Sequence, residues 1–370
     1  MPGDYNKIFG SIIANLIEKN DLTKSESKQA FIDILEDRVT SMQQGAFLAA
    51  LKSKGECAEE VAGAWEAIFD SDTYKVELDP EIDPVENSGT GMDSLKTYNI
   101  STAASIIAAS GGVPMARHGS RGISSLCGTV DLAEELGVDV ECSPNTVVDS
   151  IRSSGLGLFN GMSSNVHPCA LGRLLSGIYF GTTLNLAASL ANPALPSTGV
   201  RGVYSGDMLL PVARVMREIG YKSAIVLHGC VDGTGMGMDE ASVCGTTYCM
   251  QLFPDGTTEG FKIDPASLGM NCSDYRELEP EHDRKSEAER FAGLISNRDN
   301  DARKDAAILN AALVFLASGH CANLEQGIQE STSLLEKGAA FETMQKWVYH
   351  QNHDPDKGLK RLYSLIDPGM

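Results

Sequence analysis

The 370-residue sequence lacks an apolar run long enough to cross a membrane, and it has few basic residues for its size. A membrane-spanning helix needs about 18 consecutive apolar residues. The 30 Lys and Arg residues stand against 50 Asp and Glu residues, which gives a formal net charge of −20. Proteins that bind nucleic acid or anionic membranes need a basic face to neutralise phosphates. We therefore expect neither a membrane nor a nucleic acid as a partner.

The nine cysteines are not paired at the spacing of a metal site. His228 and Cys230 resemble half of such a site, but no second pair follows, so packing at a strand end is the better interpretation. An odd number of cysteines in a long chain without a signal peptide is typical of free thiols in a reducing cytosol. The cysteines thus predict a cytoplasmic protein.

Residues 1–70 have the pattern of helices only. Ile8, Ile12 and Leu16 recur at helical spacing, and the run from Thr23 to Glu26 is a capping-box pattern that starts the next helix. Residues 71–88 are acidic and contain prolines, which predicts a linker and a hinge into a second domain. The 42% hydrophobic content is enough for a well-buried core in each of two units.

Beyond the linker, apolar strands alternate with helices. Strands are expected at residues 138–140, 156–159, 200–204 and 222–228, and a hairpin is expected around 254–256. Residues 113–116 form a short segment before the second loop. Residues 305–318 and 324–348 indicate further helices, whereas the tail from 350 to 370 shows little pattern. The predicted fold class is α/β, with a small all-helical N-terminal domain and a large domain whose mostly parallel central sheet is flanked by helices.

Two glycine-rich polar loops flank one apolar helix between residues 86 and 131. The first loop contains GTGMD at 89–93, and NIST at 99–102 then opens the helix with Asn99 or Ser101 as its N-cap. Glycine lets the backbone approach a ligand, and a helix N-terminus offers free N–H groups and a positive dipole end to an anion. The second loop, RHGSRG at 117–122 and SSLCGT at 124–129, adds two guanidinium groups and several hydroxyls. Two such loops predict a ligand with more than one phosphate.

Asp239 and Glu240 follow the predicted strand that ends at His228. Ligands of open α/β sheets bind at the carboxyl ends of the strands, so these acids can face the phosphate loops. Neighbouring carboxylates near phosphates hold Mg²⁺, a hard cation that prefers oxygen ligands. The alternative is an acidic pair that starts a helix, and the presence of the two loops makes Mg²⁺ the favoured interpretation.

The ordered motifs GTGxD, NIST, RHGSRGISS and GTxD resemble the anthranilate phosphoribosyltransferase family, and more distantly the pyrimidine nucleoside phosphorylases of the same fold. The resemblance covers nearly the whole chain. It implies that helices from about 167–190 complete the small domain of 1–75, while 76–166 and 191–370 form the large domain that binds the donor. It also implies a homodimer through the N-terminal helices and a Mg²⁺ cofactor.

The resemblance further implies that 5-phosphoribosyl 1-pyrophosphate is the donor and anthranilate or a related aromatic amine the acceptor, in tryptophan biosynthesis. The positions that match the family's donor-binding residues are Gly89, Met92, Asp93, Thr97, Asn99, Ile100, Ser101, Thr102, Arg117, His118, Gly119, Ser120, Arg121, Gly122, Ile123, Ser124, Ser125 and Thr129. The positions that match its Mg²⁺ ligands are Ser101, Asp239 and Glu240. The positions assigned to the acceptor are Gly89, Ser120 and Arg173.

Three departures from the family pattern concern the site. Arg117-His118-Gly119-Ser120 stands where Lys-His-Gly-Asn is usual, and Met92 replaces a glycine. The arginine that binds the acceptor carboxylate does not align cleanly, because the His-Pro spacing puts Gly177 there, the Asn192-Pro193 spacing puts Leu175 there, and Arg173 fits only with a shift. A buried carboxylate needs a charged partner.

Loss of pyrophosphate develops negative charge on the leaving group, which Arg117 and Mg²⁺ would stabilise electrostatically. A neutral amine can then attack C1 of the ribose, so we expect no nucleophilic Ser, Cys or His. His118 is a possible general base, but packing against the acceptor or the loop is favoured. Three alternatives stay open, namely a family member with a different acceptor, an enzyme like the pyrimidine nucleoside phosphorylases, and a non-catalytic relative that binds nucleic acid.

Overall fold

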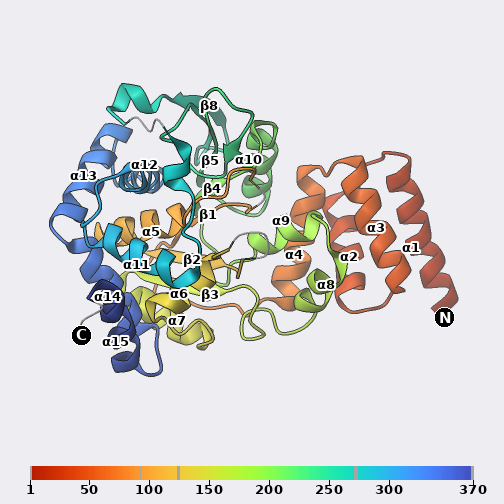
Figure 1. Ribbon diagram of the computed structural model, residues 1–370. Coiled ribbons are helices and arrows are strands. Elements are labelled where there is room, and N and C mark those ends of the chain that lie inside the picture. The colour runs from red at the N-terminus through yellow and green to blue at the C-terminus, as the bar shows by residue number, and fades with distance from the viewer. Residues whose placement is uncertain (1, 92, 123–125, 271–273, 368–370) are drawn as a thin grey trace.

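The computed structural model describes residues 2–91, 93–122, 126–270 and 274–367. The chain begins with a bundle of helices at one end of the molecule, and its carboxyl end lies at the opposite end (Figure 1). The bundle opens with α1 (Pro2–Ile17), α2 (Lys24–Leu35), α3 (Ser41–Lys54) and α4 (Ala58–Asp72). The capping box predicted at Thr23 is present, since its side chain accepts the Glu26 amide and the Glu26 carboxylate accepts the Thr23 amide.

Two further helices, α8 (Leu171–Ile178) and α9 (Thr183–Ser189), join the bundle (Figure 1). The helix α9 packs against α3 and α4, and α8 packs against α9. Leu171 and Leu184 belong to the same apolar core as Phe31 of α2. The Trp65 indole donates to the Leu190 carbonyl and ties α4 to the end of α9. The helical bundle therefore combines two segments that lie far apart in the sequence.

The second unit is built on one mixed sheet with the strand order β3-β2-β1-β4-β5-β7-β8, and β6 pairs with β5. Strands β1 to β5 run parallel, and β6, β7 and β8 add antiparallel pairings. The predicted α/β class is confirmed, and so is the hairpin, which joins β7 to β8. The strands are β1 (Val85–Ser88), β2 (Met115–Gly119), β3 (Leu156–Asn160), β4 (Thr198–Gly202), β5 (Ser223–Cys230), β6 (Gly237–Met238), β7 (Thr247–Leu252) and β8 (Thr258–Ile263).

Helices cover both faces of this sheet (Figure 1). On one face, α5 and α12 pack against each other and form the centre of the largest apolar core, whereas α10 and the end of the bundle cover the other face. The helices of this unit are α5 (Ile100–Ser110), α6 (Thr129–Leu136), α7 (Pro144–Ser154), α10 (Leu209–Glu218), α11 (Arg284–Ile295), α12 (Ala302–Ala317), α13 (Leu324–Glu336), α14 (Ala339–His350) and α15 (Pro355–Ile366). Short 3₁₀ turns lie at Gly206–Met208, Pro265–Leu268 and Tyr275–Leu278.

Three local predictions are wrong. The end of the predicted linker is β1, a central strand with all four residues buried; it contains Glu86 and Asn87, whose polar side chains are held by Tyr221 and Ser101. Residues 138–140 are irregular and lead into a turn, and their two valines enter the core without a sheet partner. The tail contains α15, which begins at the N-cap Asp354.

No described helix is long and apolar enough to cross a membrane. The eight cysteines in the described part of the chain are all free thiols. These include Cys230, at the end of β5, where the sequence suggested packing rather than a metal site.

Candidate active site

The candidate site lies where the loops after β1, β4 and β5 meet at the carboxyl edge of the sheet. Gly89 follows β1 directly, and a Cβ at this position would lie 2.5 Å from the carboxylate of Asp239. A Cβ at Gly202, the last residue of β4, would overlap the backbone oxygen of Asp239. Both positions therefore require glycine, because the loop that carries Asp239 passes directly over the ends of these two strands.

Three carboxylates form the centre of the site. One oxygen from each of Asp93, Asp239 and Glu240 lies within 4.8 Å of the others, and all three side chains are buried. Asp239 accepts hydrogen bonds from the Gly91 amide at 2.6 Å and from the Thr90 hydroxyl at 3.1 Å. The first loop and the loop after β5 are thus held together by a carboxylate.

The hydroxyl of Ser101, in the first turn of α5, lies 3.2 Å from Glu240 Oε1. The three residues matched to Mg²⁺ ligands from the sequence are therefore neighbours in the structure. Asp93 is the fourth member of this group, and it was assigned to the donor rather than to the metal. Its position in the motif GTGMD was visible in the sequence, but its proximity to Asp239 depends on the meeting of two distant loops.

The carboxylates repel one another in a buried place. Burial, followed by the negative charge of Asp239, raises the pKa of Asp93 to about 6. Burial and the charges of Asp239 and Asp93 likewise raise the pKa of Glu240 well above its usual value. The Lys96 ammonium, 3.0 Å from Asp93 Oδ1, offsets this repulsion in part.

Glu240 Oε2 is buried and has no hydrogen-bond partner in the described part of the chain. An orphaned carboxylate oxygen among like charges is costly unless a cation neutralises it. Oxygen ligands of this kind are what Mg²⁺ prefers, usually together with substrate phosphates. The donor set of Asp93, Asp239, Glu240 and Ser101 therefore fits Mg²⁺.

The first turn of α5 lies beside these carboxylates. Three buried residues lie there, namely Ile100, Ser101 and Thr102. The side-chain amide of Asn99 (Nδ2) donates to the Cys127 carbonyl of the second loop. This contact brings the two polar loops together, as the motif order suggested. Thr97 is half-buried between them, and Met92 lies outside the described residues.

The second loop is shorter than expected, because Arg117, His118 and Gly119 are the last three residues of β2. Arg117 is buried, and its guanidinium donates to the Asn87 carbonyl and to the Thr102 hydroxyl. Burial lowers the pKa of Arg117 to about 10, against the opposing effect of Glu86 and Glu240. Arg117 thus places a positive charge beneath the start of α5, between β1 and β2.

Arg121 faces away from the carboxylate cluster and contacts the acids Asp131, Glu134 and Glu141. Asp131 also accepts the amides of Gly122 and Gly128 and so closes the base of the loop. Ser120 is exposed, and Thr129 starts α6 with its methyl group against Gly119. Ile123, Ser124 and Ser125 lie outside the described residues.

His118 and His167 form a buried pair with 3.2 Å between their Nε2 atoms. His167 Nδ1 lies 2.7 Å from the Asp72 carbonyl, which can only accept, so this nitrogen carries the proton. His167 Nε2 must then accept from His118 Nε2–H, which leaves His118 Nδ1 with a lone pair. That atom is buried without a hydrogen-bond partner in the described ranges.

Burial, followed by the influence of His167, lowers the pKa of His118 to about 3, and the nearby backbone of Ser189 offsets this only in part. His118 is therefore a neutral acceptor of hydrogen bonds at the end of β2. The alternative of a ring packed within the loop region describes its surroundings better than that of a base poised near neutral pH.

Two further arginines lie on α8 and β4. Arg173, on α8, donates to the carbonyls of Ile34 and Leu35 at the end of α2, and its Nη1 lies 3.7 Å from Asp37. Arg201, on β4, was interpreted from the sequence only as a strand residue, but it is fully buried beside Gly202. A charged residue in an otherwise apolar strand was the signal that could have identified it.

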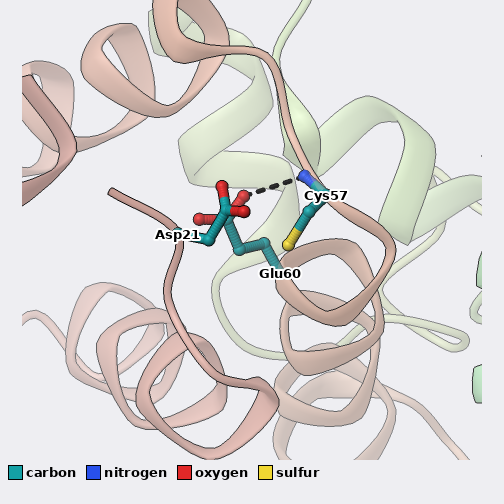
Figure 2. Close-up of side chains that lie close together, drawn as sticks. All are labelled: Asp21, Cys57 and Glu60. Atoms are coloured by element: carbon teal, nitrogen blue, oxygen red, sulfur yellow. Dashed lines mark hydrogen bonds between the residues drawn. The ribbon is translucent and has the colours of Figure 1, made fainter. Parts of the chain in front are cut away.

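A second cluster of possible metal ligands, Asp21, Cys57 and Glu60, lies at helix ends of the bundle, with Asp21 exposed and Glu60 buried (Figure 2). Glu60 accepts the backbone amides of Leu22 and Cys57, both at 2.9 Å, and pairs with the ammonium of Lys54. Lys54 also pairs with Asp21. A buried lysine already neutralises these acids, so this cluster joins the ends of three helices rather than offering a cation site.

The helical bundle and the α/β unit each match a model of a glycosyl transferase family. Residues 10–71 match the family model described as "Glycosyl transferase family, helical bundle domain", and residues 81–341 match "Glycosyl transferase family, a/b domain". The chain belongs to this glycosyl transferase family 3, the anthranilate phosphoribosyltransferase family, which confirms the resemblance.

Relatives match over almost their whole length. Anthranilate phosphoribosyltransferase of Anaeromyxobacter dehalogenans is 34% identical over 339 residues, which cover 91% of this chain and 96% of the relative. The enzyme of that name from Bacillus mycoides is 33% identical over 341 residues, with coverages of 90% and 95%.

Among solved structures, anthranilate phosphoribosyltransferase from Thermus thermophilus superposes with a TM-score of 0.82 at 26% identity, covering 92% of this chain and 99% of that one. The Saccharomyces cerevisiae enzyme in complex with PRPP and Mg has a TM-score of 0.79 at 20% identity, with coverages of 93% and 98%. At that identity the second structure supports the fold alone.

Proposed function

We propose that this protein transfers the phosphoribosyl group of 5-phosphoribosyl 1-pyrophosphate to anthranilate or a related aromatic amine, with Mg²⁺ as cofactor. The observation that carries this proposal is the buried cluster of Asp93, Asp239 and Glu240 beside the first turn of α5. Membership of the family makes phosphoribosyl transfer the natural use of such a cluster. The related yeast enzyme was solved with the donor and Mg.

In the proposed reaction, the bond from C1 of the ribose to pyrophosphate breaks, and a bond from C1 to the amine nitrogen forms. The amine then loses a proton. Bound Mg²⁺ would supply positive charge to the leaving pyrophosphate. The N-terminus of α5 and the buried Arg117 add positive potential from the protein at the same edge of the sheet.

The reaction needs positioning more than a protein nucleophile. The unpartnered Nδ1 of His118 can accept a hydrogen bond from the N–H of an incoming amine, and its low pKa keeps the ring neutral at physiological pH. Ser120 and Gly89 stay candidates for contacts to the acceptor, as the motif match predicts. The roles of Arg121 and of residues 123–125 in donor binding also stay predictions.

Turnover tests the proposal directly. Protein, Mg²⁺ and donor are mixed with anthranilate, and loss of anthranilate fluorescence is followed. We expect turnover that requires Mg²⁺ and disappears in the Asp239→Asn/Glu240→Gln double variant. Metal-independent phosphorolysis of uridine would instead identify a nucleoside phosphorylase. Donor binding without turnover would mean a different acceptor.

We also propose a homodimer formed through the N-terminal helices. Ile8 and Ile17 of α1 and Met42 of α3 are 62%, 65% and 84% exposed, although they are large apolar residues. Apolar residues grouped on two neighbouring helices favour a second copy of this chain as the covering partner. A solution mass of a single chain at high concentration would contradict the dimer.

We infer a cytoplasmic site of action in tryptophan biosynthesis. The free thiols among the described cysteines favour a reducing compartment. The assignment to tryptophan biosynthesis depends on anthranilate as the acceptor and fails if turnover shows another amine.

A further inference from the structure

Arg201 belongs to a polar row that crosses three strands at the carboxyl edge of the sheet. Arg201 of β4 is the register partner of Ser88 on β1. Val85 pairs with Met115, so Ser88 is level with His118, three residues further along each strand. Register partners in parallel strands point to the same face, and this face is the one that α9 covers near Ser189. His118, Ser88 and Arg201 therefore share one face.

The Arg201 guanidinium has only neutral partners at hydrogen-bond distance. Its Nη1 donates to the Ser88 hydroxyl at 2.7 Å, and its Nη2 donates to the Ser189 hydroxyl. Its Nε is buried with no partner in the described chain. Within the described ranges, no carboxylate lies within 4.0 Å of this buried charge.

Glu86 is the nearest candidate counter-ion on the same face, but it is a weak one. Its Oε2 accepts the Tyr221 hydroxyl at 2.7 Å, and its Oε1 has no partner in the described part of the protein. Burial raises the pKa of Glu86, so its negative charge is itself disfavoured. A buried guanidinium with an unused N–H and no direct anion is expensive, which indicates that an anionic ligand completes it.

The unused Nε and the Nη2 that contacts Ser189 form one edge of the guanidinium. A carboxylate can bind both nitrogens of this edge at once. Arg152 shows this geometry in the same protein, with Nε 2.8 Å and Nη2 3.0 Å from the two oxygens of Asp79. At Arg201, an incoming carboxylate would take the free Nε and replace the Ser189 hydroxyl at Nη2, while Ser88 holds Nη1.

The other arginines near the site are already engaged. Arg117 lies on the opposite face of the sheet with Asn87 and Thr102. Arg121 contacts three acids, and Arg173 contacts the end of α2. Arg201, in contrast, directly precedes Gly202, which touches the loop of the carboxylate cluster, and it lies in the row of His118.

We propose that Arg201 is the specificity-determining residue for the acceptor and that it binds the acidic group of an aromatic amine that carries a carboxylate. This proposal rests on the proposed function and deepens it. The amine of such an acceptor would face the lone pair of His118 Nδ1, while its ortho carboxylate would face the Nε and Nη2 edge of Arg201. His118 would thus accept a hydrogen bond from the amine, and Arg201 would donate hydrogen bonds to the neighbouring carboxylate.

The test compares anthranilate with its neutral amide, 2-aminobenzamide, in the wild type, in Arg201→Gln, and in the matched variant Arg173→Gln. The proposal expects the wild type to prefer the acid. Arg201→Gln should lose about 100-fold in kcat/KM for anthranilate but only a few-fold for the amide, because a bidentate carboxylate contact is removed. Arg173→Gln should keep the preference for the acid.

Calorimetry adds two readouts that do not need turnover. The affinity for the donor with Mg²⁺ should be the same in Arg201→Gln as in the wild type. If neither protein binds the donor, the proposed function is refuted. In that case, the affinity for anthranilate alone, compared with that for the amide, still tests the role of Arg201. Equal losses for acid and amide in Arg201→Gln, or a lost preference in Arg173→Gln, would overturn the proposal.

Arg201→Lys covers the case in which Arg201→Gln does not fold, because it keeps a positive charge without the bidentate edge. It should retain a weakened preference for the acid. If Arg201 serves only to neutralise Glu86, the double variant Arg201→Gln/Glu86→Gln should regain both thermal stability and anthranilate turnover. That recovery would also overturn the proposal.

Discussion

At the scale of single residues, the site depends on charges that burial disfavours. Asp93, Asp239 and Glu240 repel one another, and Glu240 Oε2 has no partner in the described chain. Arg117 and Arg201 place positive charge under the loops from opposite faces of the sheet. The sequence predicted positive charge from the arginines of the second loop. Arg121 is paired with Asp131 and Glu134, so the positive potential comes from the buried Arg117 and Arg201 instead.

The neutral pair of His118 and His167 predicts how stability depends on pH. Burial lowers both pKa values in the folded state, that of His118 to about 3, so the unfolded chain binds protons first as the pH falls. The stability from these neutral rings is fully present above about pH 6.5 and is lost progressively below it, by about 1.4 kcal/mol per pH unit for each ring that stays neutral.

Urea titrations between pH 5 and 7.5 measure this effect. His118→Gln should flatten the dependence of the unfolding free energy on pH, because one of the two neutral rings is gone. His320→Gln is the matched control, since that ring is exposed and lies outside the site. An unchanged slope in His118→Gln would show that the pair is not neutral.

At the scale of elements, the sequence predicted the two loops and the α/β alternation but not β1, the strand that leads into the first loop. The tight motif GTGMD makes the first loop visible, because glycine is needed where Asp239 passes over the strand end. The sequence Val85–Ser88 reads as polar, and it forms a central strand because Glu86 and Asn87 find buried partners. Such partners come from distant segments and leave no local pattern.

The positions of Asp93 and Arg201 and the helix α15 were also not predicted. Asp93 joins the carboxylates, and Arg201 joins the row of His118, only through the order of the strands in the sheet. The helix α15 did have a local signal, since Asp354 caps it, Pro355 follows, and Leu362 and Leu365 recur on its buried face. Contacts that depend on the strand order therefore cannot be predicted from local sequence. Helix starts can be predicted, because their capping residues are local.

Gly202, the last residue of β4, leaves no room for a side chain. In Gly202→Ala the added Cβ would overlap the Asp239 backbone, so the loop that carries Asp239 must move. Overpacking of this kind costs about 1–3 kcal/mol and should also weaken Mg²⁺ binding through displacement of Asp239. Gly206→Ala, which meets no atom within 4 Å, is the matched control and should leave both unchanged. Thermal melts and Mg²⁺ titrations of both variants decide the point. Equal behaviour would mean that the loop adapts freely.

At the scale of the whole molecule, two helical segments form the bundle, and its second segment leads into the sheet beside the site (Figure 1). His167 and Ser189 lie at the start and end of this second segment, and each contacts the polar row through His118 or Arg201. A movement of the bundle relative to the sheet would therefore open or close the place proposed for the acceptor. The carboxylate cluster, in contrast, lies in the α/β unit alone.

An equilibrium titration of 5-phosphoribosyl 1-pyrophosphate shows whether the carboxylate cluster binds the donor through Mg²⁺. Calorimetry with and without Mg²⁺ should show binding only when the metal is present. Asp93→Asn should weaken that binding by at least about 10-fold, because it removes one of the three carboxylates around the ion. Donor binding of equal strength without Mg²⁺, or unchanged binding in Asp93→Asn, would mean that the cluster does not hold the donor through Mg²⁺.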